Sequence, residues 1–182
     1  RAVPLTLDPA RLEELGFLDL LGQEFQARGN RVIITGRNPA KLKAAAAANP
    51  LLHAVTLDVT DPDAIRRVAA ELVERHPELN VLVNNAGIMM AEDVTTPQPD
   101  LATAEAIVTT NLLGPIRVTA ALLPQLRSRP QSAIVNVSSG LAFVPLVRTP
   151  TYSASKAALH SYTLSLRRQL RDTTTEVVEL VP

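Results

Sequence analysis

Several features that would mark particular protein classes are missing from this chain of 182 residues. It has no cysteine, which excludes a disulfide framework, a thiolate metal site and a cysteine nucleophile. No apolar run approaches eighteen residues, so we expect no membrane-spanning segment. The first twenty residues carry four acidic side chains and no compact apolar block, unlike a signal peptide. Because position 1 is arginine, we expect a chain that was processed or cut from something longer.

Neither charge is in excess, since 18 lysines and arginines balance 18 aspartates and glutamates. This balance argues against a polybasic protein that binds nucleic acid or a membrane surface. The histidines at 53, 76 and 160 lie apart without the spacing of metal ligands, so we expect no metal site. We therefore expect a cytoplasmic protein of one domain that binds neither nucleic acid nor membrane.

Short β-branched strands alternate with helices, which is typical of βαβ units and a parallel sheet. Asn38-Pro39 and Asp61-Pro62 each predict a helix start, and Pro115 predicts a kink in a long apolar helix. The predicted strands are 31–36, 51–59, 79–83, 133–137 and 175–181, and the predicted helices are 40–48, 62–76, 101–127 and 152–171. The pattern predicts a single α/β domain with a parallel sheet.

Residues with useful chemistry follow the predicted strands, and ligands of such sheets bind beyond the carboxyl ends of the strands. Tyr152 and Lys156 lie four residues apart on one predicted helix, so their side chains meet on one face. An ammonium beside a phenol stabilises the phenolate and makes tyrosine a usable acid or base, although a chance surface pair is the alternative. Ser139 follows a strand and either holds a substrate oxygen beside the tyrosine or is a turn serine.

Five motifs occur in order along the chain. They are Leu57-Asp58-Val59, Asn84-Asn-Ala-Gly87, Asn111 in Thr-Thr-Asn-Leu-Leu-Gly, Val135-Asn-Val-Ser-Ser139 and Tyr152-Ser-Ala-Ser-Lys156. In this order and spacing they resemble the adenine-pocket aspartate, the NNAG motif, the helix asparagine, the serine-bearing strand end and the YxxSK motif of the short-chain dehydrogenase/reductase family. The resemblance covers about residues 29–182 and implies a single α/β domain with a Rossmann-like, doubly wound parallel sheet.

The resemblance implies an oxidoreductase that transfers hydride between a nicotinamide cofactor and a carbonyl or alcohol. Tyr152 would be the proton donor or acceptor, and Lys156 would stabilise its phenolate and bind the nicotinamide ribose. Ser139 would hold the substrate oxygen, Asn111 would anchor a water-based proton relay, and Asp58 would bind the adenine amino group. The residues expected to contact the cofactor are Gly16, Arg37, Asp58, Val59, Asn85, Ala86, Gly87, Tyr152 and Lys156.

The choice of cofactor depends on the residue that ends the first well-defined strand. An NAD site has a carboxylate there for the ribose 2′-hydroxyl, whereas an NADP site has arginine for the 2′-phosphate. This strand ends in Gly36-Arg37, and a guanidinium pairs well with phosphate. The sequence therefore favours NADP(H) over NAD(H), the alternative being that Arg37 is merely exposed at a turn.

The N-terminal part departs from the family's pattern. A TGxxxGxG loop is expected near residues 11–18, but only Gly16 stays in register, and the stretch after Asp8-Pro9 predicts a helix instead. Prolines flank the apolar residues before it, and proline is disfavoured in the centre of a sheet. We therefore expect a divergent segment over 1–28, a Rossmann-like core over 29–182, and first and last strands that are irregular or missing.

Two functions stay open on this sequence. One is the NADP-dependent oxidoreductase, favoured by the intact catalytic set; the other is a catalytically inactive binding protein, or an incomplete gene product without the pyrophosphate loop. Apolar residues near the site suggest an apolar substrate, or they are ordinary packing: Met89, Met90, Leu141, Phe143, Val144, Pro145 and Leu146. The helices 101–127 and 152–171 are apolar enough to be shared in a homodimer or tetramer, or simply to be buried.

Overall fold

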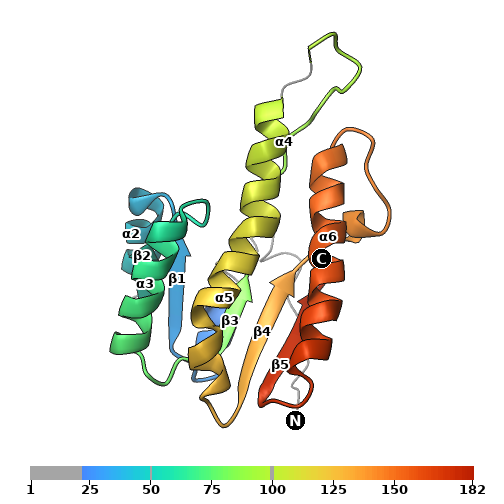
Figure 1. Cartoon of the computed structure of the whole chain (residues 1–182). Helices are drawn as coiled ribbons and strands as arrows, with labels where there is room; N and C mark the ends of the chain where they lie inside the picture. The colour runs from blue at the N-terminus through green and yellow to red at the C-terminus, as the bar shows by residue number, and fades with distance from the viewer. Residues whose placement is uncertain (1–21, 50, 99–100) are drawn as a thin grey trace. The chain divides into compact units, whose positions relative to one another are not determined.

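The computed structural model describes residues 22–49, 51–98 and 101–182. The chain divides into two compact units, Arg1–Asp58 and Val59–Pro182, and each is described by itself. The predicted first strand, Gly16 and the predicted helix after Asp8-Pro9 as far as residue 21 lie outside the described residues, and residues 22–27 at the end of that prediction are helical. Parallel strands and the helices that connect them build both units, as the alternation in the sequence predicts (Figure 1).

The first unit contains two parallel strands joined by a crossover helix. Its elements are β1 (Val32–Gly36), α2 (Pro39–Ala48) and β2 (Leu52–Thr56). The Asn38 side chain accepts hydrogen bonds from two backbone N–H groups of the first turn of α2, at 2.9 and 3.1 Å, so the predicted cap is confirmed. β2 ends at Thr56 rather than at the predicted Val59, because its partner strand ends at Gly36 and pairs with no later residue.

The second unit is built on a three-stranded parallel sheet in the order β3-β4-β5. Its strands are β3 (Val81–Asn84), β4 (Ser132–Val137) and β5 (Thr175–Leu180), and its α-helices are α3 (Pro62–Arg75), α4 (Leu101–Val108), α5 (Gly114–Arg127) and α6 (Pro150–Leu170). The Asp61 side chain caps α3, as predicted. β3 begins at Val81 rather than at the predicted Leu79, because the Leu79 N–H donates to His76 O (2.9 Å) in the turn that ends α3.

The predicted helix 101–127 is interrupted at its centre. Between α4 and α5 the chain makes a π-helical turn, Thr109–Leu113, in which the Gly114 N–H donates to Thr109 O five residues back. Pro115 has no N–H to donate to the carbonyl of Asn111, four residues back, so the α-helical ladder cannot run through this turn. The irregularity predicted from Pro115 therefore takes the form of a π turn that contains Asn111.

Taken as one helix of 27 residues, Leu101–Arg127 is long and apolar enough to cross a membrane by length and composition alone. The core helix of a soluble protein passes the same test, and this helix contributes Ile107, Leu122 and Leu126 to the buried residues of the second unit. No other helix in the described ranges passes. Length and composition are weak evidence for a membrane span, and the burial of these side chains indicates a role in packing.

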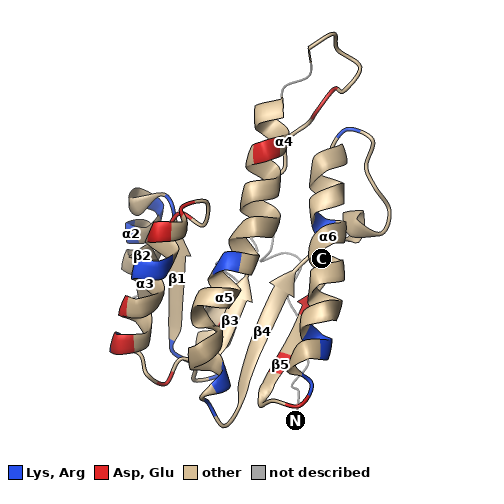
Figure 2. Cartoon of the chain, viewed as in Figure 1, with Lys and Arg blue, Asp and Glu red and all other residues tan. Residues whose placement is uncertain are grey.

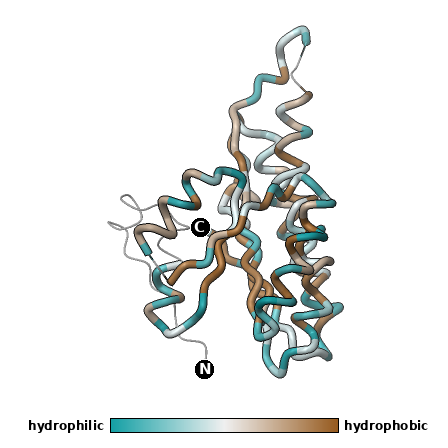
Figure 3. Tube along the Cα trace, turned by 90° about the vertical axis from the view of Figure 1, so that its left-hand side faces the viewer, coloured by the Kyte–Doolittle hydropathy of each residue, from teal (hydrophilic) through white to brown (hydrophobic). Residues whose placement is uncertain are grey.

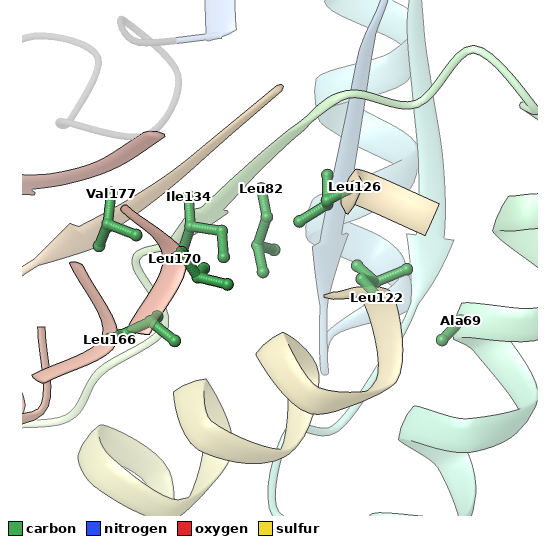
Figure 4. Packing of buried hydrophobic residues seen from close by; sticks show 8 residues of the cluster. All are labelled: Ala69, Leu82, Leu122, Leu126, Ile134, Leu166, Leu170 and Val177. Carbon is green, nitrogen blue, oxygen red and sulfur yellow. The ribbon is translucent and has the colours of Figure 1, made fainter. Parts of the chain in front are cut away.

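The core of the second unit lies between its sheet and the helices α3, α5 and α6 (Figure 4). The cluster consists of Ala69, Leu82, Leu122, Leu126, Ile134, Leu166, Leu170 and Val177. Ile134 in β4 and Leu126 in α5 are fully buried, and each such side chain stabilises the fold by about 2 kcal/mol. Hydrophobic stretches follow the strands, whereas the helices alternate in hydropathy (Figure 3). β3 and β4 carry no charged residue, whereas β5, the third strand of this sheet, carries Glu176 and Glu179 (Figure 2).

Candidate active site

Polar residues gather at the carboxyl edge of the second unit's sheet. β3 ends at Asn84 and runs on into the predicted segment Asn85–Gly87, while β4 ends at Val137 and is followed by Ser138 and Ser139. Asn84 lies opposite Asn136 in the parallel register, so the two strand ends lie side by side. α6 and the 3₁₀ turn that follows Ser139 pack against each other and complete the site.

Lys156 is the buried cation of the site. The residue is only 4% exposed, and its Nζ donates a hydrogen bond to Val137 O at 2.8 Å. The same Nζ lies 5.7 Å from the ring centroid of Tyr152, which bears out the predicted meeting of these side chains on one face of a helix. Burial lowers the pKa of Lys156, because the charged form loses its water. No carboxylate among the described residues pairs with it, so the site holds an ammonium that an oxygen-rich ligand would stabilise.

Asn111 connects the segment after β3 to α6. Its side chain is fully buried: Oδ1 accepts from Ile88 N (2.8 Å), and Nδ2 donates to Ile88 O (2.9 Å) and to Ser155 Oγ (3.1 Å). Ser155 Oγ in turn donates to Tyr152 O at 2.7 Å. The π turn therefore places this amide where it holds both the predicted cofactor segment and the predicted catalytic helix, while the implied water relay stays a prediction.

Gly87 keeps the space beside these two side chains open. A Cβ atom at this position would lie 3.4 Å from Asn111 Oδ1 and 3.6 Å from Lys156 Nζ. Gly87 and Ala86 are exposed and Asn85 is half-buried, so their backbone is accessible to a ligand. An ammonium has three donors, and one of those of Lys156 is used by Val137 O. The accessible backbone of Gly87 and the remaining N–H donors of Lys156 fit a ribose, whose hydroxyl groups accept hydrogen bonds.

Ser139 is half-buried and begins a short 3₁₀ turn, Gly140–Ala142. Its Oγ accepts a hydrogen bond from Leu141 N at 3.2 Å, so the serine does cap a turn, as the structural alternative predicts. A hydroxyl that accepts one bond still has its proton to donate, so this role does not exclude contact with a substrate oxygen. The two interpretations of Ser139 are therefore compatible.

The other predicted cofactor residues divide between the units. Arg37 is exposed directly after β1, and no described side chain pairs with its guanidinium. Asp58 is half-buried and has an interaction partner, and it ends the first unit. Val59 begins the second unit and packs against Gly114 in α5, where an added Cβ would lie 3.1 Å from Val59 Cγ2. Gly16 lies outside the described residues.

A buried polar ladder beneath the site was not predicted. Asn84 Nδ2 donates to Asn136 Oδ1 (2.8 Å) across β3 and β4 and to Thr119 Oγ1 (3.0 Å) in α5, and Asn136 Nδ2 donates to Thr163 Oγ1 (2.9 Å) in α6. All four residues are buried. Each satisfied amide fixes a strand relative to a helix, so the ladder holds the strand ends in place. The signal available in the sequence was an asparagine within each of two apolar strands.

The apolar residues predicted near the site lie mainly at the surface. Six of the seven are exposed, including Met89 at 56% and Val144 at 75%, and Leu141 is half-buried. One of them, Phe143, packs edge-on against His160 in α6, with the ring centroids 4.8 Å apart. The seven residues lie in the two segments that follow β3 and β4, and their role as a substrate wall stays a prediction.

A family model described as short chain dehydrogenase matches residues 18–182. The uncharacterized oxidoreductase DltE of Bacillus subtilis (strain 168) is 43% identical over 154 residues, which cover 85% of this chain and 61% of that protein. Serine 3-dehydrogenase of Rhizobium radiobacter is 33% identical over 168 residues, which cover 92% of this chain and 67% of that protein. The chain thus spans less than two thirds of the length of DltE.

Solved structures agree with these relatives. The closed form of serine dehydrogenase complexed with NADP⁺ has a TM-score of 0.82 at 28% identity, covering 89% of this chain and 65% of that one. An actinorhodin polyketide ketoreductase variant with NADPH has a TM-score of 0.83 at 28% identity, covering 88% of this chain and 63% of that one. The predicted single-domain, Rossmann-like α/β fold with parallel sheets is therefore confirmed.

Proposed function

The chain belongs to the short-chain dehydrogenase/reductase family of oxidoreductases, and on that premise we propose that it transfers hydride between NADP(H) and a carbonyl or alcohol. The observation that carries the proposal is the buried ammonium of Lys156 beside the ring of Tyr152. A buried cation without an ion-pair partner costs stability, and such groups concentrate at functional sites.

Two groups of residues support nicotinamide binding. Lys156 has donors left for ribose hydroxyls, and the backbone of Gly87 beside it is open. The exposed guanidinium of Arg37 favours the 2′-phosphate of NADP(H), because planar guanidinium groups bind phosphate with two hydrogen bonds. The nicotinamide supplies the hydride chemistry that side chains lack. Structural neighbours hold NADP⁺ or NADPH, in agreement with a nicotinamide cofactor.

The proton would pass through Tyr152. Its phenol gives a proton to the carbonyl oxygen during reduction and takes one from the alcohol during oxidation. The Lys156 ammonium stabilises the phenolate that results, and Val137 O keeps that ammonium in place. The Ser139 hydroxyl donates to the substrate oxygen, which orients the reacting carbon. Asn111 completes the tetrad by fixing the segment at Ile88.

The exposed apolar residues of the segments after β3 and β4 favour an apolar carbonyl or alcohol. Serine is the substrate that the name of one relative gives, so it is the polar alternative. Members of the family bind small molecules and often oligomerise. Exposed apolar residues on α4 and α6, such as Leu101 and Leu164, support a homodimer or tetramer through these helices.

The test is turnover of the purified chain with NADPH and three carbonyl probes, hexanal, benzaldehyde and acetophenone, and with NADP⁺ and L-serine in the reverse direction. Tyr152→Phe should abolish turnover and leave NADPH affinity nearly unchanged, because it removes the proton and keeps the ring. The matched control is Tyr162→Phe, since Tyr162 lies on the same helix and packs on the core cluster.

Wild-type turnover in Tyr152→Phe would show that Tyr152 is not the acid or base of the reaction. The second candidate, an inactive relative that binds a protein, rests on the single glycine that remains in register in the predicted phosphate loop. A folded chain that binds neither NADPH nor NADH would favour this candidate over the enzyme.

A further inference from the structure

The first turn of α6, which carries Tyr152, is not capped by its own sequence. The N-cap residue Thr149 makes no side-chain capping bond, and its Oγ1 is buried without a hydrogen-bond partner among the described residues. Pro150 follows and has no N–H. The first backbone donor that lies inside the helix therefore belongs to Thr151, and an unsatisfied donor at a buried helix end is costly.

Glu92 supplies the missing cap from 59 positions away in the sequence. Thr151 N donates to Glu92 Oε2 at 3.0 Å, and Thr151 Oγ1 donates to Glu92 Oε1 at 2.7 Å. Both carboxylate oxygens are engaged, and the side chain is half-buried. Hydrogen bonds to a carboxylate are stronger than neutral ones, and a negative charge at a helix N-terminus is further stabilised by the helix dipole.

The backbone around Glu92 is fixed to the same helix. Glu92 N donates to Arg148 O at 2.9 Å, in the loop that leads into α6. Four residues earlier, Ile88 is held by Asn111, which also donates to Ser155 Oγ in the second turn of α6. The segment between these two attachments contains the exposed Met89 and Met90. It is therefore tied to α6 on both sides of Tyr152.

We propose that Glu92 is a positioning residue of the reaction: by holding Thr151 it fixes the neighbouring Tyr152 relative to Lys156. This inference rests on the proposed function. Tyr152 is constrained from the other side as well, since its carbonyl accepts from Ser155 Oγ. A displacement of about 1 Å in a reacting group costs on the order of a hundredfold in rate, so a cap at this place controls turnover as well as folding.

The test compares Glu92→Gln and Thr151→Val with the conservative variant Thr151→Ser, using NADPH and whichever of the carbonyl probes the wild-type chain reduces. Glu92→Gln and Thr151→Val should each lower kcat on the order of tenfold and leave KM nearly unchanged, because each removes a charge-assisted bond. The double variant should be about as slow as Glu92→Gln alone, since Thr151→Val removes one of the two hydrogen bonds that Glu92→Gln weakens. Thr151→Ser should keep wild-type kcat.

The matched control is Asp93→Asn, the same acid-to-amide change one residue along. Asp93 accepts hydrogen bonds from Thr95 N (3.0 Å) and Thr95 Oγ1 (2.6 Å), within its own loop. This variant should keep wild-type kcat. A fall in kcat equal to that of Glu92→Gln would show a general effect of the loop and would overturn the proposal.

Hydrogen exchange of the amides of residues 151–156 gives a second readout that needs no turnover. We expect faster exchange in Glu92→Gln, confined to this turn and the next, and weaker NADPH binding through Lys156. A wild-type chain that neither reduces a carbonyl probe nor oxidises L-serine contradicts the proposed function. The exchange result still tests the contact between Glu92 and Thr151 in that case. Unchanged exchange and unchanged NADPH affinity in Glu92→Gln would overturn the positioning role, as would a rise in KM with unchanged kcat.

Discussion

The ammonium of Lys156 leaves water when the chain folds, and this burial lowers its pKa below the ordinary value of 10.5. Between the lowered pKa and 10.5, the unfolded chain keeps a proton that the folded chain has released, so the free energy of unfolding rises with pH. Each pKa unit contributes about 1.4 kcal/mol to this rise.

Lys156→Met removes the titrating ammonium, and it should therefore remove the increase in the free energy of unfolding with pH. Urea unfolding at a series of neutral to alkaline pH values gives the free energy of unfolding of both chains. The quantity of interest is the wild-type value minus the value for the variant. The difference should increase with pH up to the ordinary lysine value and then level off. A difference that stays constant across the series would show that Lys156 keeps its ordinary pKa.

The proposed preference for NADP(H) over NAD(H) depends on the guanidinium of Arg37. Arg37→Ala should weaken NADPH binding by an order of magnitude or more, as expected from a lost charge-assisted bond of about 1.5–3 kcal/mol, and should leave NADH binding nearly unchanged. Calorimetric titration measures both affinities. Lys43→Ala, at an exposed position of α2, is the control for loss of positive charge. Equal affinity of the parent chain for NADPH and NADH would contradict the assignment.

At the scale of elements, the contact of α5 with Val59 depends on a glycine. A Cβ at Gly114 would lie 3.1 and 3.2 Å from the Val59 side chain and 3.4 Å from its carbonyl, so the helix or the loop must shift. Gly114→Ala gains about 1 kcal/mol of helix propensity but should lose about 1–3 kcal/mol to overpacking. We expect net destabilisation, and weaker NADPH binding if Val59 lines the cofactor as predicted.

The control for this substitution is another helical glycine, Gly22. A Cβ there meets its nearest atoms at 3.9 and 4.0 Å, which is ordinary van der Waals contact. Gly22→Ala should therefore leave the free energy of unfolding unchanged or raise it, as measured by urea unfolding. Equal effects of the two substitutions would refute the close packing of α5 on Val59.

The sequence predicted elements best where the signal is local. Asn38-Pro39 and Asp61-Pro62 set the starts of α2 and α3, because capping needs only the next few residues. Pro115 predicted the position of the irregular turn, because its missing N–H disrupts the hydrogen bonds of only one helical turn. The four-residue spacing of Tyr152 and Lys156 predicted their proximity for the same reason.

The contacts that hold the site together were not predictable in this way. Asn84 and Asn136 are 52 positions apart, and Glu92 and Thr151 are 59 apart. Such pairs form only once the register of the strands is set, and no local pattern encodes that register. The resemblance to a family supplied Asn111, but the π turn that points its amide at Ile88 came from the structure.

At the scale of the whole molecule, burial is unequal between the two units. All the buried hydrophobic residues of the described ranges except Leu57 belong to the second unit, and α2 has no buried residue. Local opening requires little free energy where few apolar contacts must break. Amides of β1 and β2 should therefore exchange with solvent faster than those of β4 and β5, as measured by hydrogen exchange. Equal protection in both sheets would contradict this.

The measurement that tests the proposed function most directly is a calorimetric titration of the purified, folded chain with NADPH, with NADH as the control. A dissociation constant of about 1 μM or tighter, or about −8 kcal/mol, with much weaker NADH binding is the expected result. It would place the Tyr152–Lys156 pair in a working cofactor site. No binding of either nucleotide by a folded chain would contradict the oxidoreductase and favour the inactive, protein-binding relative.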